Sequence, residues 1–219
     1  RVGERRWGMG VPGESAGGVD APSPGLDLGG IAKGYTADAC RDLAVAMGAC
    51  GVLVSVGTSS VSVFGTRADG SSWRAGLRDP QGGPTSVAGI VQLPAGGMAS
   101  LSTSGDNLGP LGVLAPEVVG RAAGSASDHR ARETSRETSV GDGRVFDHHI
   151  IDPRTGYPAH AGVRQVSVVA SSGVLAEALS TALLVDPSID VPDVVARWAC
   201  ETGAPASAKV VGLVRAEQS

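Results

Sequence analysis

A helix expected over residues 172–185 constrains this chain more than any other segment. Ser172 suits the N-cap position, and apolar side chains recur at the spacing of one helix face, at Leu175, Leu179, Ala182 and Leu183. Glu177 and Thr181 stand four residues apart, so their carboxylate and hydroxyl share one face of the helix. The solvated face of an ordinary amphipathic helix carries such pairs too, so the segment alone leaves their role open.

The other expected elements are short strands and two further helices. The helices lie at 35–47, where Gly48 suits the C-cap, and at 190–200, with Pro192 in the first turn. The stretch 107–144 contains Gly-Pro, Gly-Ser and mixed charges, and we interpret it as a flexible surface insertion. We expect a single domain over residues 1–219. Strands are expected at 52–56, 61–64, 73–77, 87–93, 97–103, 166–170 and 209–214.

Composition narrows the functional classes. Of the 219 residues, 42% are hydrophobic and 3% are aromatic, which is typical of a globular chain with a core of Val, Leu, Ile and Ala. The net charge of −4 argues against general nucleic-acid binding. No segment of the sequence is long and apolar enough to cross a bilayer. The three cysteines, Cys40, Cys50 and Cys200, do not have the spacing of a metal site.

A glycine-rich turn precedes the first expected helix, and residues 26–35 read Leu-Asp-Leu-Gly-Gly-Ile-Ala-Lys-Gly-Tyr. Glycines before a helix N-terminus let the backbone approach a ligand, and the helix end favours phosphate. Lys33 would add a cation. A plain strand, turn and helix with a solvated lysine explains the segment equally well, because short glycine motifs are weak signals.

A second polar turn lies at 148–158, where His149, Asp152 and Thr155 are close in sequence. Asp-Pro and Thr-Gly are ordinary turn pairs. A histidine of the neighbouring pair can act as a base, or it can donate a hydrogen bond to a phosphate or a ring. A zinc site is the rival interpretation, and it is disfavoured because no third soft ligand lies at standard spacing.

The available ligands favour a hard cation. Glu177 and Thr181 offer oxygen atoms, and a backbone carbonyl of the turn at Gly29 and Gly30 is a possible third ligand. Oxygen ligands suit Mg²⁺ better than Zn²⁺. The segment Ser102-Thr103-Ser104-Gly105-Asp106 offers hydroxyls and amides that either bind phosphate or only end a strand.

Four of these segments occur in a fixed order along the chain, at 27–35, 102–106, 149–156 and 176–182. Together they closely resemble the ApbE family, the FAD:protein FMN transferases, and the segments 53–57 and 73–80 match as well. The resemblance runs from about Leu26 to Val185 and continues less distinctly to the C-terminus. Each motif is modest alone, whereas their joint order is specific. The resemblance implies an α+β fold, with mixed β-sheets and packed helices around a flavin-nucleotide cleft.

The resemblance also implies an activity and a set of site residues. The activity is Mg²⁺-dependent transfer of FMN from FAD to a threonine hydroxyl of a partner flavoprotein, with release of AMP. His149 is then the candidate for activating or orienting the acceptor hydroxyl. The implied metal ligands are Glu177, Thr181 and the carbonyl of Gly30, with Ser180 as a further candidate. The implied flavin-nucleotide contacts are Asp27, Gly29, Lys33, Ser104, Ile151, Asp152 and Thr155.

Three features depart from the family pattern. Glu177 stands where the family usually has Asp, and Gly57-Thr58 replaces a Gly-Gly pair. Roughly a hundred residues usually precede the first motif, a fair fraction of a domain, whereas here residues 1–25 do. The alternative function is therefore a flavin- or nucleotide-binding member without transferase turnover. Family members are often exported and anchored on the outer face of the cytoplasmic membrane, and this sequence shows no signal peptide.

Overall fold

A computed structural model of the chain describes residues 27–82, 85–105 and 149–215. The expected insertion at 107–144 lies outside these ranges. The largest sheet has five strands in the order β1-β2-β5-β8-β9, and each neighbouring pair is antiparallel. These strands are β1 (Gly51–Val56), β2 (Ser60–Gly65), β5 (Met98–Gly105), β8 (Val163–Ala170) and β9 (Ala208–Arg215).

Two small antiparallel hairpins accompany this sheet. One consists of β3 (Arg74–Arg78) and β4 (Val87–Gln92), and the other of β6 (Ile151–Asp152) and β7 (Tyr157–Pro158). The helices are α1 (Ala32–Ala46), α3 (Gly173–Val185) and α4 (Val191–Thr202). The expected α+β class is confirmed, and the strand pairs of the described residues are all antiparallel.

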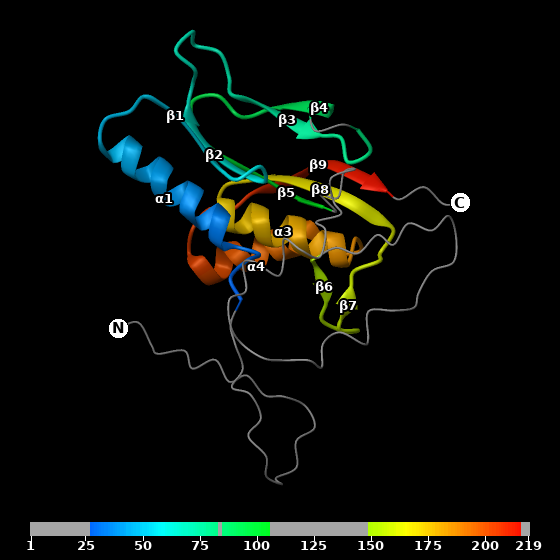
Figure 1. Cartoon of the computed structure of the whole chain (residues 1–219). Helices are drawn as coiled ribbons and strands as arrows, with labels where there is room; N and C mark the ends of the chain where they lie inside the picture. The colour runs from blue at the N-terminus through cyan, green and yellow to red at the C-terminus, as the bar shows by residue number, and fades with distance from the viewer. Residues whose placement is uncertain (1–26, 83–84, 106–148, 216–219) are drawn as a thin grey trace, which may run out of the picture.

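The five-stranded sheet is covered on both faces (Figure 1). The helices lie on one face and the β3–β4 hairpin lies on the other. On the hairpin side, Val63, Leu77 and Leu101 belong to one buried apolar cluster. On the helix side, a second cluster joins Val166 and Val168 of β8 to one face of α3. The apolar face of α3 contains Leu175, Leu179 and Leu183, as its sequence spacing predicts.

The two long C-terminal helices begin where their capping residues indicate. The Ser172 side chain accepts a hydrogen bond of 3.2 Å from the backbone N–H of Leu175 at the start of α3. Asp190 accepts one of 3.1 Å from the backbone N–H of Asp193 at the start of α4. Each cap satisfies a backbone donor that has no partner within its own helix.

The helix-facing side of β2 and β5 is lined with serines rather than apolar residues. Ser60, Ser62, Ser100 and Ser102 are at most 1% exposed. Buried hydroxyls are costly unless they form hydrogen bonds. Ser62 and Ser100 lie 2.9 Å apart and both donate to Asp38 Oδ1 of α1, at 2.6 and 2.7 Å. This part of the interior is therefore held by a polar network, while the neighbouring strand β8 makes apolar contacts.

Helices α1 and α3 touch backbone to backbone at two glycines. A Cβ atom added to Gly34 would lie 2.2 Å from the carbonyl oxygen of Gly173, and one added to Gly173 would lie 2.4 Å from the carbonyl oxygen of Gly34. Both distances are far inside van der Waals contact, so neither position accepts a side chain without separating the helices. This close approach places the first turn of α1 beside the first half of α3.

We expect Gly34→Ala to destabilise the protein. Alanine normally stabilises a helix by about 1 kcal/mol relative to glycine, but here its methyl group meets backbone atoms that cannot rotate away. The net loss should be about 2 kcal/mol, typical of overpacking, and urea unfolding followed by circular dichroism measures it. Gly89→Ala is the matched control, because an added Cβ there meets nothing within 4 Å. Equal stabilities of the two variants would contradict the close contact.

Candidate functional site

Glu177 is the centre of the candidate site. It lies on α3 and is 2% exposed. Its Oε2 atom accepts a hydrogen bond of 2.6 Å from the backbone N–H of Gly34 in the first turn of α1. Helix α1 has no side-chain cap of its own and no acidic residue in its first turn. Glu177 therefore supplies from α3 the carboxylate that the positive end of α1 favours.

The second oxygen of Glu177 faces Lys33. The Lys33 Nζ atom lies 2.5 Å from Glu177 Oε1. The same ammonium donates a hydrogen bond of 3.1 Å to the carbonyl oxygen of Gly29. Despite the short distance, Oε1 is buried and receives no hydrogen bond of normal geometry from any described residue. Glu177 thus has one oxygen fixed by the backbone and one that only the lysine charge compensates.

The glycine turn before α1 is shaped by Asp27. Its Oδ1 atom accepts a hydrogen bond of 2.7 Å from the backbone N–H of Gly29, which is the geometry of an Asx turn. Asp27 and Gly29 are exposed, and Gly30 is half-buried. An added Cβ at Gly30 would meet nothing within 4 Å. The turn is therefore open to a ligand on the side of Gly30.

A set of hydroxyls lies one turn further along α3. Ser104 Oγ of β5 lies 2.9 Å from Ser180 Oγ and 3.0 Å from Thr181 Oγ1. Ser180 is fully buried, and its hydroxyl is also within hydrogen-bond distance of Ser102 Oγ, at 3.3 Å, and of the Glu177 carbonyl, at 3.1 Å. Ser104 is expected to contact the nucleotide. The structure places its hydroxyl within hydrogen-bond distance of Ser180 and Thr181, which are expected to bind the metal.

The β6–β7 turn is held separately at the far end of α3. Arg154 forms an ion pair of 3.0 Å with Asp152 and one of 3.2 Å with Asp186, the C-cap of α3. Ile151 and Thr155 are exposed. Within the described ranges, no hydrogen bond or ion pair links Asp152, Ile151 or Thr155 to Glu177 or its partners. The structure therefore brings Gly29, Lys33, Glu177, Ser104, Ser180 and Thr181 into two adjoining groups and leaves Ile151, Asp152 and Thr155 in a third.

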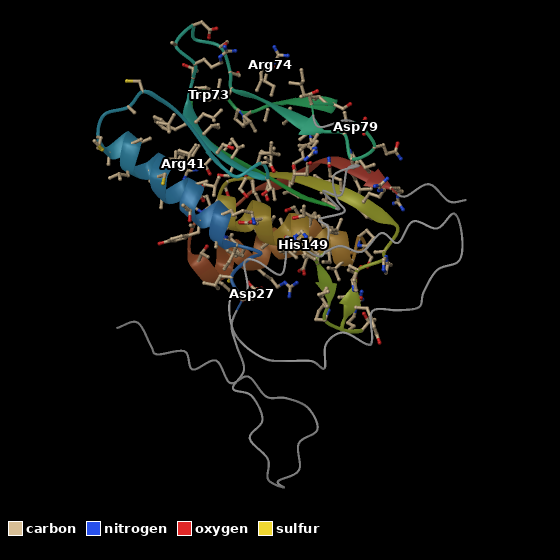
Figure 2. All side chains as sticks on the ribbon, in the orientation of Figure 1. Asp27, Arg41, Trp73, Arg74, Asp79 and His149 are labelled. Atoms are coloured by element: carbon tan, nitrogen blue, oxygen red, sulfur yellow. The ribbon has the colours of Figure 1, made fainter. Side chains whose placement is uncertain are left out.

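His149 is exposed at the start of the described segment 149–215. Figure 2 shows His149 and Asp27 on the helix side of the sheet, whereas Trp73, Arg74 and Asp79 lie on the hairpin side. His149 belongs to the face of the molecule that carries the glycine turn and α3. The catalytic role expected for it stays a prediction.

Sequence reasoning missed Asp38 and Arg41. Asp38 Oδ2 accepts a hydrogen bond of 2.6 Å from the backbone N–H of Gly173, and Oδ1 accepts one of 2.9 Å from Arg41. Arg41 is only 3% exposed, although it lies on a helix. Asp38 therefore ties α1 to the start of α3 and to the serines of the sheet. No local pattern marks this role, because the partners lie far away in the sequence.

The ApbE family model matches residues 16–109 and 121–202. The chain belongs to the ApbE family. It is 34% identical over 173 residues to the FAD:protein FMN transferase of Treponema pallidum, covering 73% of this chain and 37% of that protein. It is 28% identical over 178 residues to the FAD:protein FMN transferase of Salmonella typhimurium, covering 81% of this chain and 41% of that protein.

Solved ApbE structures share the fold. The ApbE protein of Thermotoga maritima superposes with a TM-score of 0.54 at 29% identity, covering 88% of this chain and 51% of that one. The flavin transferase ApbE of Vibrio cholerae, at 23% identity and a TM-score of 0.53, supports the fold alone. This ApbE-family chain spans 37% and 41% of the length of the two curated relatives named above. No helix of the described residues is long and apolar enough to cross a membrane.

The donor atoms of this ApbE-family site fit a hard cation. Glu177 Oε1 is a buried carboxylate oxygen without a hydrogen bond, and such an oxygen gains most from a cation. In the part of the chain that the structure describes, no three His, Cys, Asp or Glu side chains cluster together. The other ligands would therefore be hydroxyl and backbone oxygens, which suit Mg²⁺.

The titration of the Asp152 carboxyl in the β6–β7 turn depends on Arg154. Its hydrogen bonds lower the pKa of Asp152 below the ordinary value of 3.8. A lowered pKa means that the ion pair is intact above pH 3.8 and is lost as the pH falls through the lower value. We expect Arg154→Gln to raise the pKa of Asp152 toward the ordinary value, as seen in the ¹³C shift of the carboxyl carbon. The pKa of Asp69, which Ser71 lowers instead, should not change, and an unmoved Asp152 would contradict the assignment.

Proposed function

We propose that this chain takes part in Mg²⁺-dependent transfer of FMN from FAD to a threonine hydroxyl of a partner flavoprotein, with release of AMP. The observation that supports it is the buried carboxylate of Glu177. Its Oε1 accepts no hydrogen bond from a described residue and faces Lys33, while its Oε2 accepts one from the Gly34 N–H. The names of the family relatives support flavin transfer to a protein. The metal, the threonine and the leaving AMP are our proposal.

The proposed cation ligands are Glu177, the Thr181 hydroxyl and the carbonyl oxygens of Gly30 and Ser180. When bound there, Mg²⁺ would neutralise charge that develops on the pyrophosphate during phosphoryl transfer. Nucleotide contacts are proposed at the α1 end, where a helix N-terminus and Lys33 both favour phosphate oxygens. Asp27 would keep the turn in shape through its bond to the Gly29 N–H.

The proposed reaction exchanges the phosphoanhydride bond of FAD for a phosphoester bond to the acceptor. The acceptor hydroxyl oxygen forms a bond to the FMN phosphorus, and the bond between that phosphorus and the oxygen of AMP breaks. The hydroxyl proton passes to a base, for which we propose His149, because an imidazole nitrogen can accept a proton and the His149 side chain is exposed. Ser104, Ile151, Asp152 and Thr155 are proposed to hold the flavin nucleotide.

A second candidate function is binding of a flavin nucleotide without turnover. One observation favours it: Lys33 already compensates the charge of Glu177. Under this proposal the chain would bind FAD tightly but release no AMP.

A transfer assay separates the two functions. The purified chain is mixed with FAD, Mg²⁺ and an acceptor flavoprotein domain that a longer family member labels, and the product is read by in-gel flavin fluorescence and intact mass. We expect an FMN adduct on the acceptor that EDTA abolishes. Tight FAD binding without an adduct would favour the second function. If neither FAD nor Mg²⁺ raised the melting temperature, both would be refuted for this chain.

A further inference from the structure

Lys33 occupies an unusual position for a lysine. It is the second residue of α1, where the helix dipole disfavours a positive charge. Its side chain is 40% exposed, yet the ammonium turns back onto the protein. There it contacts Glu177 Oε1 at 2.5 Å and the Gly29 carbonyl oxygen at 3.1 Å. The buried carboxylate, rather than the helix, therefore holds the lysine in place.

The ammonium lies in front of Glu177 Oε1, the carboxylate oxygen that accepts no hydrogen bond from a described residue. Glu177 Oε2 is engaged by the Gly34 N–H, so a cation bound by the carboxylate must approach Oε1. Oε1 is also the atom that Lys33 faces. Two positive charges at contact distance from one buried oxygen repel each other strongly, because the surroundings screen them little. Contact of a divalent cation with this atom and contact of the Lys33 ammonium with it therefore disfavour each other.

We propose that Lys33 is an internal cation that competes with a divalent metal for Glu177, so that metal binds only after the lysine leaves the carboxylate. The inference rests on the proposed role of Glu177 as a metal ligand. Lys33 can leave because its flexible four-carbon stem is partly exposed and its other contact is a single hydrogen bond to a backbone carbonyl. The lysine keeps the buried charge compensated when no metal is present.

The first test measures Mn²⁺ binding to the whole chain without flavin, using the electron paramagnetic resonance signal of free Mn²⁺. We expect Lys33→Met to bind Mn²⁺ roughly tenfold more tightly than the unsubstituted chain, because a competing charge is removed. Lys33→Arg keeps the charge and should bind close to the unsubstituted chain. The chain has two lysines, and Lys209→Met is the matched control for loss of an exposed positive charge.

The outcomes separate this inference from the proposed function. Glu177→Gln should lose Mn²⁺ binding. If it does, but Lys33→Met binds no more tightly than the unsubstituted chain, the competition is refuted and the metal site stands. If Glu177→Gln binds normally, Glu177 is not a ligand and both proposals fail. If neither the unsubstituted chain nor Lys33→Met binds Mn²⁺, the competition is refuted as well, since removing the lysine should have exposed the oxygen.

A second test observes the lysine directly. With ¹³C-labelled lysine the chain gives two ε-methylene signals, one for each lysine. Mg²⁺ should shift the signal of Lys33 and leave that of Lys209 unchanged. A Lys33 signal that stays in place at saturating Mg²⁺ would show that the ammonium does not leave Glu177.

Discussion

Asp38→Ala should lower the free energy of unfolding by about 3 kcal/mol or more, the usual cost of breaking a buried charge network. The substitution removes an acceptor for four donors: the hydroxyls of Ser62 and Ser100, the guanidinium of Arg41 and the backbone N–H of Gly173. The Asp38 side chain is 13% exposed and that of Arg41 is 4% exposed, so water replaces these bonds poorly. For a chain of this size the loss corresponds to a fall in Tm of roughly 6–12 °C.

The matched control for this prediction is Asp42→Ala on the same helix. Asp42 also pairs with Arg41, at 2.8 Å, but its side chain is 54% exposed. Exposed ion pairs contribute about 1 kcal/mol at most, so the control should change stability little. Chemical and thermal unfolding of both variants measures the two losses of stability. Similar losses at the two positions would mean that Asp38 is an ordinary surface partner of Arg41 and does not join α1, α3 and the sheet.

Glu177→Gln should reduce metal-dependent flavin transfer by about 100-fold or more, since even groups that only support a metal ligand cost 10- to 100-fold. The glutamine carbonyl oxygen can still accept the hydrogen bond from the Gly34 N–H, so the fold and the α1–α3 contact should persist. What is lost is the charge that a divalent cation requires. The rate of FMN adduct formation at saturating FAD measures the effect, and circular dichroism checks the fold.

Glu201→Gln is the control for charge alone, because Glu201 lies exposed near the end of α4. It should transfer at the unsubstituted rate. A Glu177→Gln variant that stays folded and transfers flavin as fast as Glu201→Gln would remove Glu177 from the proposed metal site. It would leave the carboxylate with the structural role of capping α1.

The local elements of this protein follow directly from its sequence. The spacing of Leu175, Leu179 and Leu183 and the cap at Ser172 predicted α3 with its correct ends and buried face. The order of the motifs along the chain also indicated the ApbE family, which the match to the family model confirms. These inferences succeed because caps, periodicity and turn residues act over a few neighbouring positions, which a single sequence displays.

Only the tertiary structure decided what surrounds Glu177. Its hydrogen bond to Gly34 spans 143 positions of the chain, and the bond from Gly173 to Asp38 spans 135. Both depend on the contact between two glycines that permit α1 and α3 to meet. A sequence shows that a carboxylate lies on a helix, but it does not show which distant donor will satisfy it. The partner is fixed only on folding, because burial removes water and each buried polar atom then needs a hydrogen-bond partner within the protein.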